Sequence, residues 1–497
     1  MLYLSARGKI FNKRCDIHFM KKSHITPTQH ESYFSIDELF FSTTDKKGVI
    51  TSGNSVFTRV SGYTFTELFG KPHNIIRHPD MPRAVFKLLW DYLDAGKLIA
   101  AYVKNLAKDG SYYWVVALAI PIDDGYLSIR FKPSSSFFAL IPEVYRELCD
   151  IENEHEADDR GWKSGMDAAT ERLLAILASL GFGSYDAFMH AALREELKSR
   201  QTLLCELVSE EAFPPSRRKS REDGRSESSD QLLCIYDGYL AVGNHVDVLF
   251  ARMDDYMSLN EKLQEKSVFI LGLTNSIRLF ALNASVEAVR LGGAGRTLSI
   301  IAAQLKEYSR TIASKVTLLN RRMLSLSDAL KTVIFDLAVA KLQIDMATVF
   351  IQEVLYPLPG QGEGQDEGYA TTEKIRVLGN VFSDTARRML NLMDSIRGEL
   401  GQVRNESQQL YGDIRTLRIV HLNGKMEAVS LGQRTRFPVI LEDVAVQIER
   451  ATSELNDLVW AVEESQSKLL EIPAIDSSIT ESIGKIHLAV EQLQEAA

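Results

Sequence analysis

Few residues in this sequence have the types and spacing that catalysis or metal binding requires. No nucleophile stands in a recognisable motif with a histidine and an acid, and neither a Walker loop nor an HExxH motif occurs. His155 stands among carboxylates in NEHEADD without the paired spacing of a metal site, so a solvated surface is the better interpretation. The four cysteines lie far apart and form no CxxC pair, which suits a reducing compartment: Cys15, Cys149, Cys205 and Cys234. We therefore predict a protein that is not an enzyme and holds no metal.

The run GKPHNIIRHPDMP (residues 70–82) holds polar residues suited to binding rather than to catalysis. A guanidinium can pair bidentately with the phosphates of a dinucleotide, and a histidine can hydrogen-bond the polar edges of a ligand. The alternative is a structural turn, in which Pro79 and Pro82 stiffen the backbone, Asp80 caps the next helix and Arg77 is only solvated. The residue types alone leave both interpretations open.

The segment around this run, residues 33–135, mixes strand and helix patterns. Short β-rich runs (LFFSTTD, VITSGN, IAAYVKN, YYWVVALAIPI and YLSIRFK) bracket a helical middle, and the turn sequences DKKG, KDG and DDG separate strands. Two strands, a helical stretch and three more strands predict a small antiparallel sheet with a helical cover. Such an α+β domain of about 100 residues can enclose a small-molecule pocket.

From Phe40 to Lys132 the sequence resembles the PAS domain of bacterial aerotaxis transducers. The resemblance is carried by STTDKKGVITSGNSVFTRVSGYTFTELFGKPHNIIRHPDMP, by VKNLAKDGSYYWV and by YLSIR. In that family the PAS domain holds FAD and reports the redox state of the respiratory chain. The resemblance places the family's flavin-associated residues on Asn54, Arg77, His78 and Asp80. It therefore favours a cofactor site over a structural turn.

One departure from the family pattern affects the expected flavin site. Six residues before the asparagine of the VKN run, where the family has a tryptophan, this chain has Ile99, which removes a large aromatic surface from the expected pocket. Trp90 and Trp114 are near in sequence, but Trp114 fits the strand pattern of YYWV and is expected in the core. We therefore expect weak or partial occupancy by FAD.

Beyond this domain the sequence predicts only helices. Residues 136–213 carry apolar residues at helical spacing and predict a connector domain of three or four helices, and the charged, serine-rich residues 214–230 predict a linker. Two helical hairpins follow at 231–355 and 369–497, joined by the proline- and glycine-rich linker 356–368. Their four arms of about 60 residues each predict a long antiparallel four-helix coiled-coil bundle.

The two hairpins repeat one sequence pattern. ALNASVEAVRLGGAGR (281–296) recurs as HLNGKMEAVSLGQRTR (421–436), at an offset of 140 residues. Glycines end the first of these helices, and we expect both tips to lie at the same end of the bundle. Apolar residues before the glycines recur at steps of three and four, so we expect them to form a helix face that packs within the bundle: Leu279, Leu282, Val286 and Val289.

The first tip resembles the cytoplasmic hairpin tip of methyl-accepting chemotaxis receptors, whose pattern is LNAAxEAARAGExGR. In that family the tip contacts neighbouring dimers, a histidine kinase and its coupling protein. The sequence departs from the pattern at Gly293 and, in the second copy, at Ser430. Ordinary support between residues three or four apart on a helix is the less favoured alternative, because LN and EAV survive in both copies. The resemblance implies partner-binding roles for Asn283, Glu287, Arg290, Arg296, Asn423, Glu427 and Arg436.

Charge and hydropathy narrow the class of partner. A net charge of −9 provides no basic field, which disfavours nucleic acid and anionic membranes as main partners and favours a protein or a small molecule. No apolar run approaches the roughly 18–20 residues that a membrane span needs. Residues 1–32 lack the apolar stretch of a secretory signal and are expected to be a tail that starts at Met1 or Met20. We expect a cytoplasmic protein with no membrane span.

Together these patterns predict a multidomain fold, an α+β PAS domain followed by an all-α connector and bundle. We expect a soluble sensor of redox state, oxygen or energy whose bundle contacts chemotaxis-type partners at its tip. The alternatives are a cofactor-free PAS and coiled-coil scaffold, and a regulator that acts outside chemotaxis. Two fused hairpins can bury each other's apolar faces, so we expect the bundle to form within one chain and any dimer to form through the PAS region.

Overall fold

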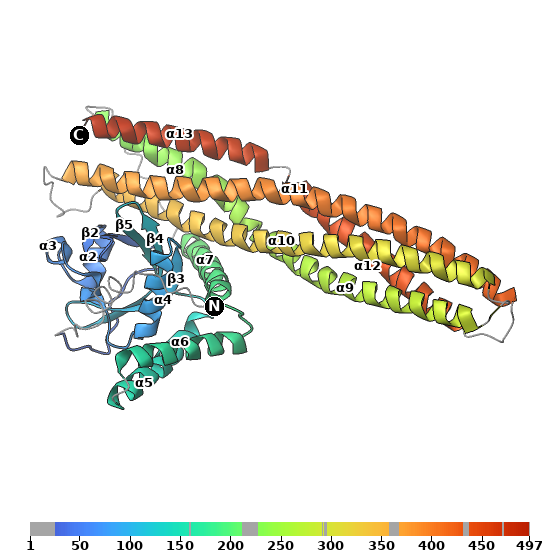
Figure 1. Ribbon diagram of the computed structural model, residues 1–497. Helices are drawn as coiled ribbons and strands as arrows, with labels where there is room; N and C mark the ends of the chain where they lie inside the picture. The colour runs from blue at the N-terminus through green and yellow to red at the C-terminus, as the bar shows by residue number, and fades with distance from the viewer. Residues whose placement is uncertain are drawn as a thin grey trace. The chain divides into compact units, whose positions relative to one another are not determined.

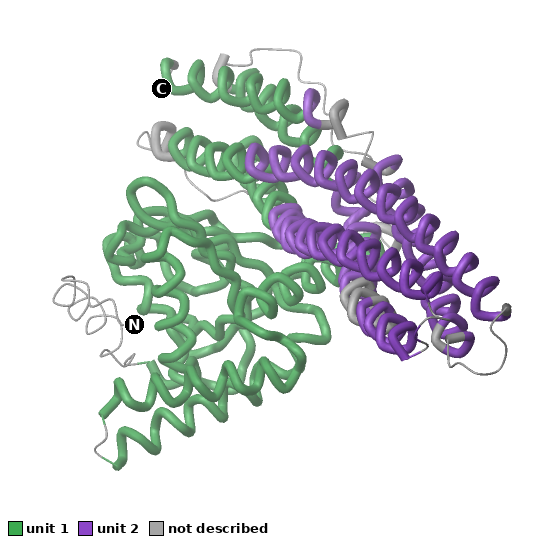
Figure 2. The backbone as a smooth tube through the Cα atoms, turned by 45° about the vertical axis from the view of Figure 1, so that its right-hand side comes forward, with its two compact units in different colours: residues 1–246, 338–385, 479–497 green, residues 247–337, 386–478 purple. Residues whose placement is uncertain are grey.

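A computed structural model of the chain (Figure 1) describes residues 25–158, 161–210, 227–290, 292, 296–356, 367–430, 437–469 and 472–496. The N-terminal tail up to residue 24, most of the 214–230 linker and Arg436 lie outside these residues. The chain divides into two compact units (Figure 2), residues 1–246, 338–385 and 479–497 in the first and residues 247–337 and 386–478 in the second.

The first unit contains one five-stranded antiparallel sheet in the order β2-β1-β5-β4-β3. The strands are β1 (Phe40–Asp45), β2 (Ile50–Gly53), β3 (Ile99–Leu106), β4 (Tyr112–Ile122) and β5 (Gly125–Phe131). Between β2 and β3 come the helices α2 (Ser55–Ser61), α3 (Phe65–Leu68), η1 (His73–Ile76) and α4 (Arg83–Asp94). The predicted α+β domain, two strands, helices and three strands, is confirmed.

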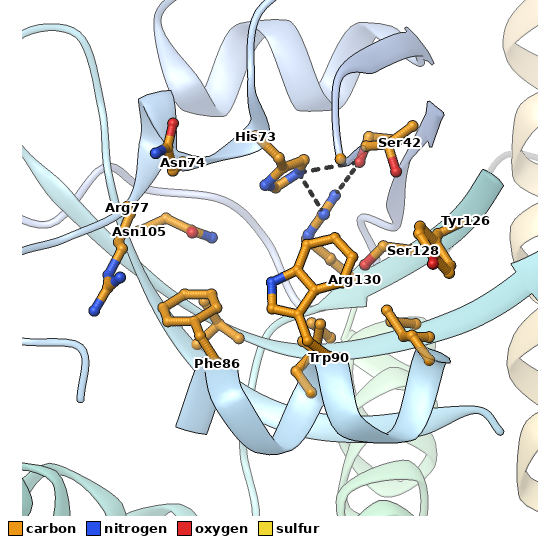
Figure 3. Close-up of a pocket in the computed structure, with 17 residues that line it drawn as sticks. Ser42, His73, Asn74, Arg77, Phe86, Trp90, Asn105, Tyr126, Ser128 and Arg130 are labelled. Atoms are coloured by element: carbon orange, nitrogen blue, oxygen red, sulfur yellow. Dashed lines mark hydrogen bonds between the residues drawn. The ribbon is translucent and has the colours of Figure 1, made fainter. Parts of the chain in front are cut away.

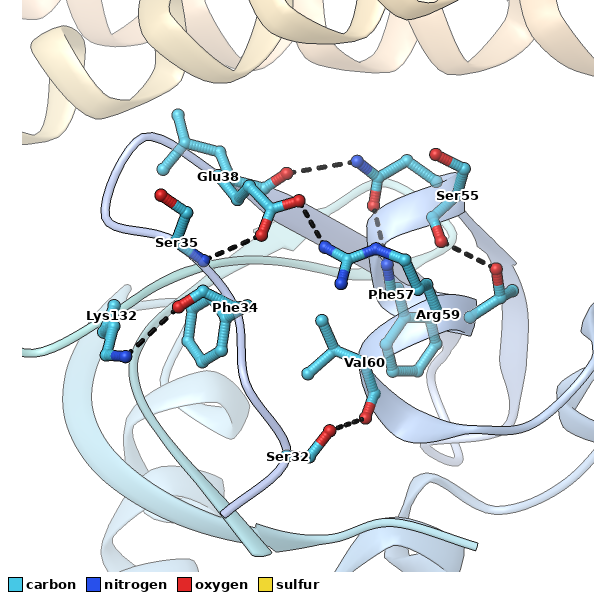
Figure 4. Close-up of polar contacts among 12 residues, drawn as sticks. Ser32, Phe34, Ser35, Glu38, Ser55, Phe57, Arg59, Val60 and Lys132 are labelled. Carbon is cyan, nitrogen blue, oxygen red and sulfur yellow. Dashed lines mark hydrogen bonds and ion pairs between the residues drawn. The ribbon is translucent and has the colours of Figure 1, made fainter. Parts of the chain in front are cut away.

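The chain before β1 is held against this domain (Figure 4). Ser32 Oγ donates to the carbonyl of Val60 at 2.8 Å, and Lys132 Nζ donates to the carbonyl of Phe34 at 3.1 Å. Arg59 pairs with Glu38, whose other oxygen accepts the backbone N–H of Ser35. Backbone hydrogen bonds from residues 28, 30 and 32 to the β3–β4 turn region bring part of the expected tail onto the sheet as well.

Three helices follow the sheet in the first unit, α5 (Ile141–Ala157), α6 (Trp162–Ser179) and α7 (Tyr185–Glu210), with the short η2 (Phe138–Leu140) before them. They account for the predicted connector. Tyr145 Oη and Tyr185 Oη donate to the carbonyls of Tyr102 and Ala100 at 2.8 and 2.9 Å, so these helices are fixed directly to the backbone of β3.

The remaining helices are α8 (Glu227–Ala251), α9 (Met253–Arg290), α10 (Arg296–Leu355), α11 (Glu367–Ser430), α12 (Phe437–Leu469) and α13 (Ile472–Ala496). Only the second and third predicted arms are single helices. The first arm is interrupted at Arg252 and the fourth arm is divided between α12 and α13, so the expectation of four continuous arms is wrong. Pro473, two residues into the sequence of α13, was a visible sign that the fourth arm does not continue through this region.

Within the second unit the two hairpins pack on each other. Lys266 of α9 pairs with Glu454 of α12, and Arg322 of α10 pairs with Glu399 and Glu406 of α11. An apolar seam along α10 is buried, and it consists of Leu319, Met323, Leu326, Leu330, Val333 and Leu337. The expected helical bundle, built from two tandem hairpins, is therefore confirmed.

The buried face near the tips differs from the expected one. Ala281, Ala284 and Ala288 are buried on α9, whereas the larger residues Leu279, Leu282, Val286 and Val289 are 52–78% exposed. In the second copy a Cβ added at Gly424 would lie 3.2 Å from Ile301 of the first hairpin. Small residues let the helices approach closely here, and this close approach turns the larger apolar residues outward.

Candidate functional site

The α+β domain contains a cavity of about 100 Å³ between the sheet and its helical cover (Figure 3). This volume holds several water molecules, but it is smaller than the cavity of roughly 150 Å³ that binds benzene and much smaller than a whole dinucleotide needs. One part of the lining is polar or charged and the other is aromatic. The lining includes Ser42, His73, Asn74, Arg77, Phe86, Trp90, Asn105, Tyr126, Ser128 and Arg130.

Arg130 of β5 is the central charged group of this cavity. It is 4% exposed, and no carboxylate in the described part of the chain pairs with it. Its Nη1 donates to Ser42 Oγ at 2.9 Å, and its guanidinium lies 5.6 Å from the ring centre of Phe57. Burial lowers the pKa of Arg130 to about 10, so the side chain stays protonated at neutral pH. A buried cation without a counter-ion is costly, which suits a site completed by a ligand with acceptor oxygens or negative charge.

His73 orients Arg130 from the opposite wall. Arg130 Nη2 lies 2.7 Å from His73 Nε2, and Ser42 Oγ lies 3.2 Å from the same nitrogen. A guanidinium has no acceptor, so Nε2 must accept and the proton of the neutral imidazole resides on Nδ1. The ring of His73 also stacks on Phe57 at 6.1 Å, with an angle of 6° between the planes. The hydrogen bonds to Ser42 and His73 therefore hold the guanidinium in one orientation (Figure 3).

The opposite end of the cavity has an unsatisfied donor beside aromatic rings. The side-chain Nδ2 of Asn105 is buried and has no partner in the residues that the structure describes. Arg77 lies with its guanidinium 4.5 Å from the ring centre of Phe86 and donates to the carbonyl of Met81 at 2.9 Å. Burial lowers the pKa of Arg77 to about 10. Trp90 of α4 contacts Tyr126 edge to face at 5.5 Å and supplies an aromatic wall.

Of the four residues predicted to bind a cofactor, only Arg77 lines this cavity. His78 is buried nearby, with Nδ1 accepting the backbone N–H of Asp80 at 3.1 Å. The side chain of Asp80 is 64% exposed and pairs with Lys104 Nζ at 2.6 Å. Asn54 caps α2, accepting the N–H groups of Phe57 and Phe41. The structure thus places Arg77 in the cavity lining, keeps His78 and Asp80 in contact with each other outside it, and uses Asn54 as a helix cap.

Ile99 does not line the cavity, although it is fully buried on the same strand as Asn105. Trp90 lines the cavity instead, so an aromatic wall is present at another position. Arg130, His73 and Asn105 were not singled out from the sequence as site residues. The signal available for Arg130 was its alternation with Ser128 against the apolar residues of YLSIRFK, which places both on one face of the strand.

Comparison with known proteins agrees with this architecture. The PAS fold family matches residues 50–128. Residues 50–128 form a PAS domain. Over 131 residues the chain is 41% identical to the aerotaxis receptor of Escherichia coli strain K12, a match that covers 25% of this chain and 26% of that receptor. The chain therefore matches only about a quarter of the receptor's length.

Two solved structures are similar to part of this chain. The PAS domain of a protein from Colwellia psychrerythraea is 22% identical, with a TM-score of 0.17 and coverage of 19% of this chain and 85% of that one. A variant of the fungal photoreceptor VVD is 18% identical, with a TM-score of 0.17 and coverage of 26% of this chain and 98% of that one.

Glutamates from outside the PAS domain cap backbone groups inside it. Glu353 of α10 accepts the N–H of Ser55 through Oε1 at 2.8 Å and the side-chain Nδ2 of Asn54 through Oε2 at 3.3 Å. Glu152 of α5 accepts the first two N–H groups of α4 at 2.9 and 2.8 Å, where Pro82 offers no side-chain cap. The pKa of Glu152 is raised by burial, against the lowering effect of these hydrogen bonds. Helix α4, which lines the cavity, and helix α2 are therefore each tied to a helix outside the PAS domain.

The tip of the bundle exposes an apolar stripe in each hairpin copy. Residues at equivalent positions are exposed to similar extents: Leu279 (58%) and Ile419 (55%), Leu282 (55%) and Leu422 (49%), Val286 (52%) and Met426 (67%), Val289 (78%) and Val429 (70%). Beside the first stripe, Arg290 pairs with Glu287 at 3.7 Å, while Asn283, Arg296 and Asn423 are exposed and Glu427 is half-buried. A duplicated exposed apolar surface is typical of a protein-binding site.

The described residues contain neither a metal site nor a membrane-spanning helix. No group of three or more histidine, cysteine, aspartate or glutamate side chains there is placed to hold a metal ion. None of the helices described is long and apolar enough to cross a membrane.

Proposed function

We propose that this chain is a sensor whose PAS domain holds the ring system of a flavin, FAD as in the aerotaxis family, and passes the state of that flavin to the helical bundle. The observation that carries the proposal is the PAS cavity, in which a buried arginine without a carboxylate partner and an unsatisfied asparagine amide face one enclosed space with aromatic walls. The likeness of the same region to the aerotaxis receptor supports the choice of cofactor.

The lining residues have the chemistry to bind a flavin ring, and the cavity of about 100 Å³ would have to widen to admit the three fused rings. The pyrimidine edge of the flavin carries carbonyl oxygens that accept hydrogen bonds, and a buried donor is available for them at each end of the cavity, Arg130 at one and Asn105 at the other. Trp90 and Phe86 offer aromatic faces to the ring and exclude water from it. A bound flavin supplies reversible electron uptake with a change of charge on its ring. Arg130 would respond to that charge, because a buried guanidinium interacts strongly with a group in the same low-dielectric space.

The geometry offers a short route from the cavity to α10. Arg130 donates to Ser42 of β1, and the neighbouring residue Phe41 donates its N–H to Asn54 at 3.2 Å. Asn54 is the N-cap of α2 and bonds Glu353 of α10. On the other face of β1, the ring of Phe41 contacts Phe350 of α10 edge to face at 5.1 Å. A change in the hydrogen bonds of Arg130 would therefore alter the contacts of two residues of α10, Phe350 and Glu353.

The remaining parts of the proposal concern the tip and the site of action. The exposed apolar stripes and the surrounding residues Asn283, Glu287 and Arg290 support a protein partner at the tip, in line with a chemotaxis-type kinase and coupling protein. Such partners work in the cytoplasm, which is where we propose that this protein acts as a transducer rather than as an enzyme.

A titration with FAD tests the flavin proposal. Purified full-length protein is expected to quench flavin fluorescence saturably and to keep a flavin absorption spectrum after gel filtration. Arg130→Met is expected to weaken binding roughly 10- to 100-fold, the scale of a hydrogen bond to a charged group. Arg59→Met, the same change at an exposed position of the same domain, is the matched control and should bind normally. Wild-type protein that takes up no flavin would favour the cofactor-free scaffold.

A further inference from the structure

A second cavity, in the connector, has a lining unlike that of the PAS site. It measures about 240 Å³ and lies among α4, η2, α5, α6 and α7. Its lining contains no charged residue and consists of aliphatic residues and five aromatic rings: Val85, Leu140, Ile141, Val144, Leu173, Ile176, Leu177 and Leu180 with Phe137, Tyr145, Phe182, Tyr185 and Phe188. Four of these rings form a connected cluster, in which Phe137, Phe182 and Phe188 lie 5.6–6.1 Å from one another and Tyr185 lies 5.9 Å from Phe188.

The polar atoms of this cavity are already satisfied. Its two hydroxyl groups, those of Tyr145 and Tyr185, donate to backbone carbonyls of β3. Water needs two to four polar partners in a buried site. A cavity of about 150 Å³ with an apolar lining therefore stays dry, and it is large enough to bind benzene. A larger cavity with the same chemistry is therefore unsuited to water and suited to an apolar molecule. An empty apolar space of this size would also be destabilising.

We propose that this connector cavity is a second ligand site, which takes an uncharged apolar molecule of one or two rings or a stretch of acyl chain of similar volume. Leu140 and Leu180 line the cavity and are 49% and 48% exposed, so they mark an entrance from the protein surface. The absence of a charged side chain from the lining excludes a phosphate or carboxylate as the buried part of the ligand.

Ligand in this cavity would act on the same elements as the PAS site. Val85 of α4 lines the connector cavity, while its neighbours Phe86 and Trp90 line the PAS cavity. Tyr145 and Tyr185 connect the connector cavity to β3, the strand that carries Asn105. The site needs no flavin, and its existence does not depend on the proposed redox function.

Titration of the full-length protein with two neutral probes, naphthalene and decan-1-ol, tests this site. Saturable calorimetric binding of either probe at one site per chain supports the proposal, naphthalene indicating a ring ligand and decan-1-ol an acyl chain. Leu173→Phe fills the cavity and is expected to weaken binding at least tenfold and to raise the unfolding midpoint of the ligand-free protein. Leu174→Phe, at a 45% exposed position on the same helix, is the matched control and should change neither quantity.

Ile176→Phe fills the cavity from another position and serves if Leu173→Phe does not fold. The proposal is overturned if neither probe binds saturably, or if a folded filling variant binds the probe as tightly as the wild-type protein does. Binding that survives in both filling variants would place the probe elsewhere on the chain.

Discussion

Glu353 of α10 and Ser55 of α2 are 298 residues apart in sequence and share a hydrogen bond of 2.8 Å, in which the carboxylate Oε1 accepts a backbone N–H. The first N–H groups of a helix lack partners within that helix, and a negative charge there is stabilising. A bundle helix thus completes the cap of a helix in the PAS domain.

Removing this carboxylate should loosen α2 selectively. We expect Glu353→Ala to reduce the hydrogen-exchange protection of the Ser55 amide about fivefold, which corresponds to about 1 kcal/mol for a lost, partly exposed cap. Glu353→Gln keeps one acceptor oxygen and should have a smaller effect. Gln352→Ala changes the exposed neighbouring residue and should leave the protection of Ser55 unchanged. Equal protection in Glu353→Ala and wild type would show that the contact does not hold α2.

Arg130, which we propose binds the flavin, should lower the stability of the flavin-free protein. Replacing it by methionine removes a buried charge without a carboxylate partner, so we expect Arg130→Met to raise the free energy of unfolding of flavin-free protein by about 1–3 kcal/mol. Urea denaturation of the wild type and the variant, both freed of flavin, measures this difference. A destabilised variant would mean that the hydrogen bonds to Ser42 and His73 outweigh the cost of burying the charge.

His78 should make the PAS domain sensitive to acid. Burial and the neighbouring Lys104 lower the pKa of His78 to about 4, against an opposing effect of Asp80. The unfolded chain therefore binds more protons than the folded one between pH 6.5 and about 4, and stability is lost as the pH falls through this window, by at most about 3 kcal/mol.

His78→Asn tests this acid sensitivity, because asparagine can keep the acceptor for the N–H of Asp80 and does not titrate. We expect its unfolding free energy to fall less steeply than that of the wild type over this pH range. Parallel curves for the two proteins would assign the acid sensitivity to other groups.

The sequence predicted the strands and helices better than it predicted which residues contact one another in the folded chain. The alternating runs marked all five strands, whereas Asn54, which the resemblance assigned to the cofactor, caps the helix SVFTRVS in the structure. Alternation could not say which face of YLSIRFK would border a cavity, and it therefore did not select Arg130. The contact between Glu353 and Ser55 has no local signal, since it depends on how the chain folds back on itself.

The tips show why hydrophobicity alone selected the wrong face. Two sets of residues on α9 recur at helical spacing, the alanines from Ala281 and the larger residues from Leu279. The larger set has the stronger apolar pattern, but the structure buries the alanines, and in the second copy Gly424, the residue equivalent to Ala284, also lies in a closely packed place. We interpret the exposed set as a surface that binds a protein partner.

Substitutions in the two sets should separate core from surface. Ala284→Leu forces extra volume into a closely packed position and is expected to cost about 1–3 kcal/mol of stability. Leu282→Ala, on the exposed stripe two residues away, should change stability by no more than about 0.5 kcal/mol. Thermal unfolding followed by circular dichroism distinguishes these outcomes. A larger loss of stability in Leu282→Ala than in Ala284→Leu would show that the stripe belongs to the buried core.

The most direct test of the sensor account is hydrogen exchange of full-length protein reconstituted with FAD, compared between oxidised and chemically reduced samples. The account predicts a change in the protection of the Ser55 amide and of α10 around Phe350 and Glu353 on reduction, and a smaller change around Phe350 in Glu353→Ala. Identical exchange in the two redox states, or a protein that takes up no FAD, would contradict it.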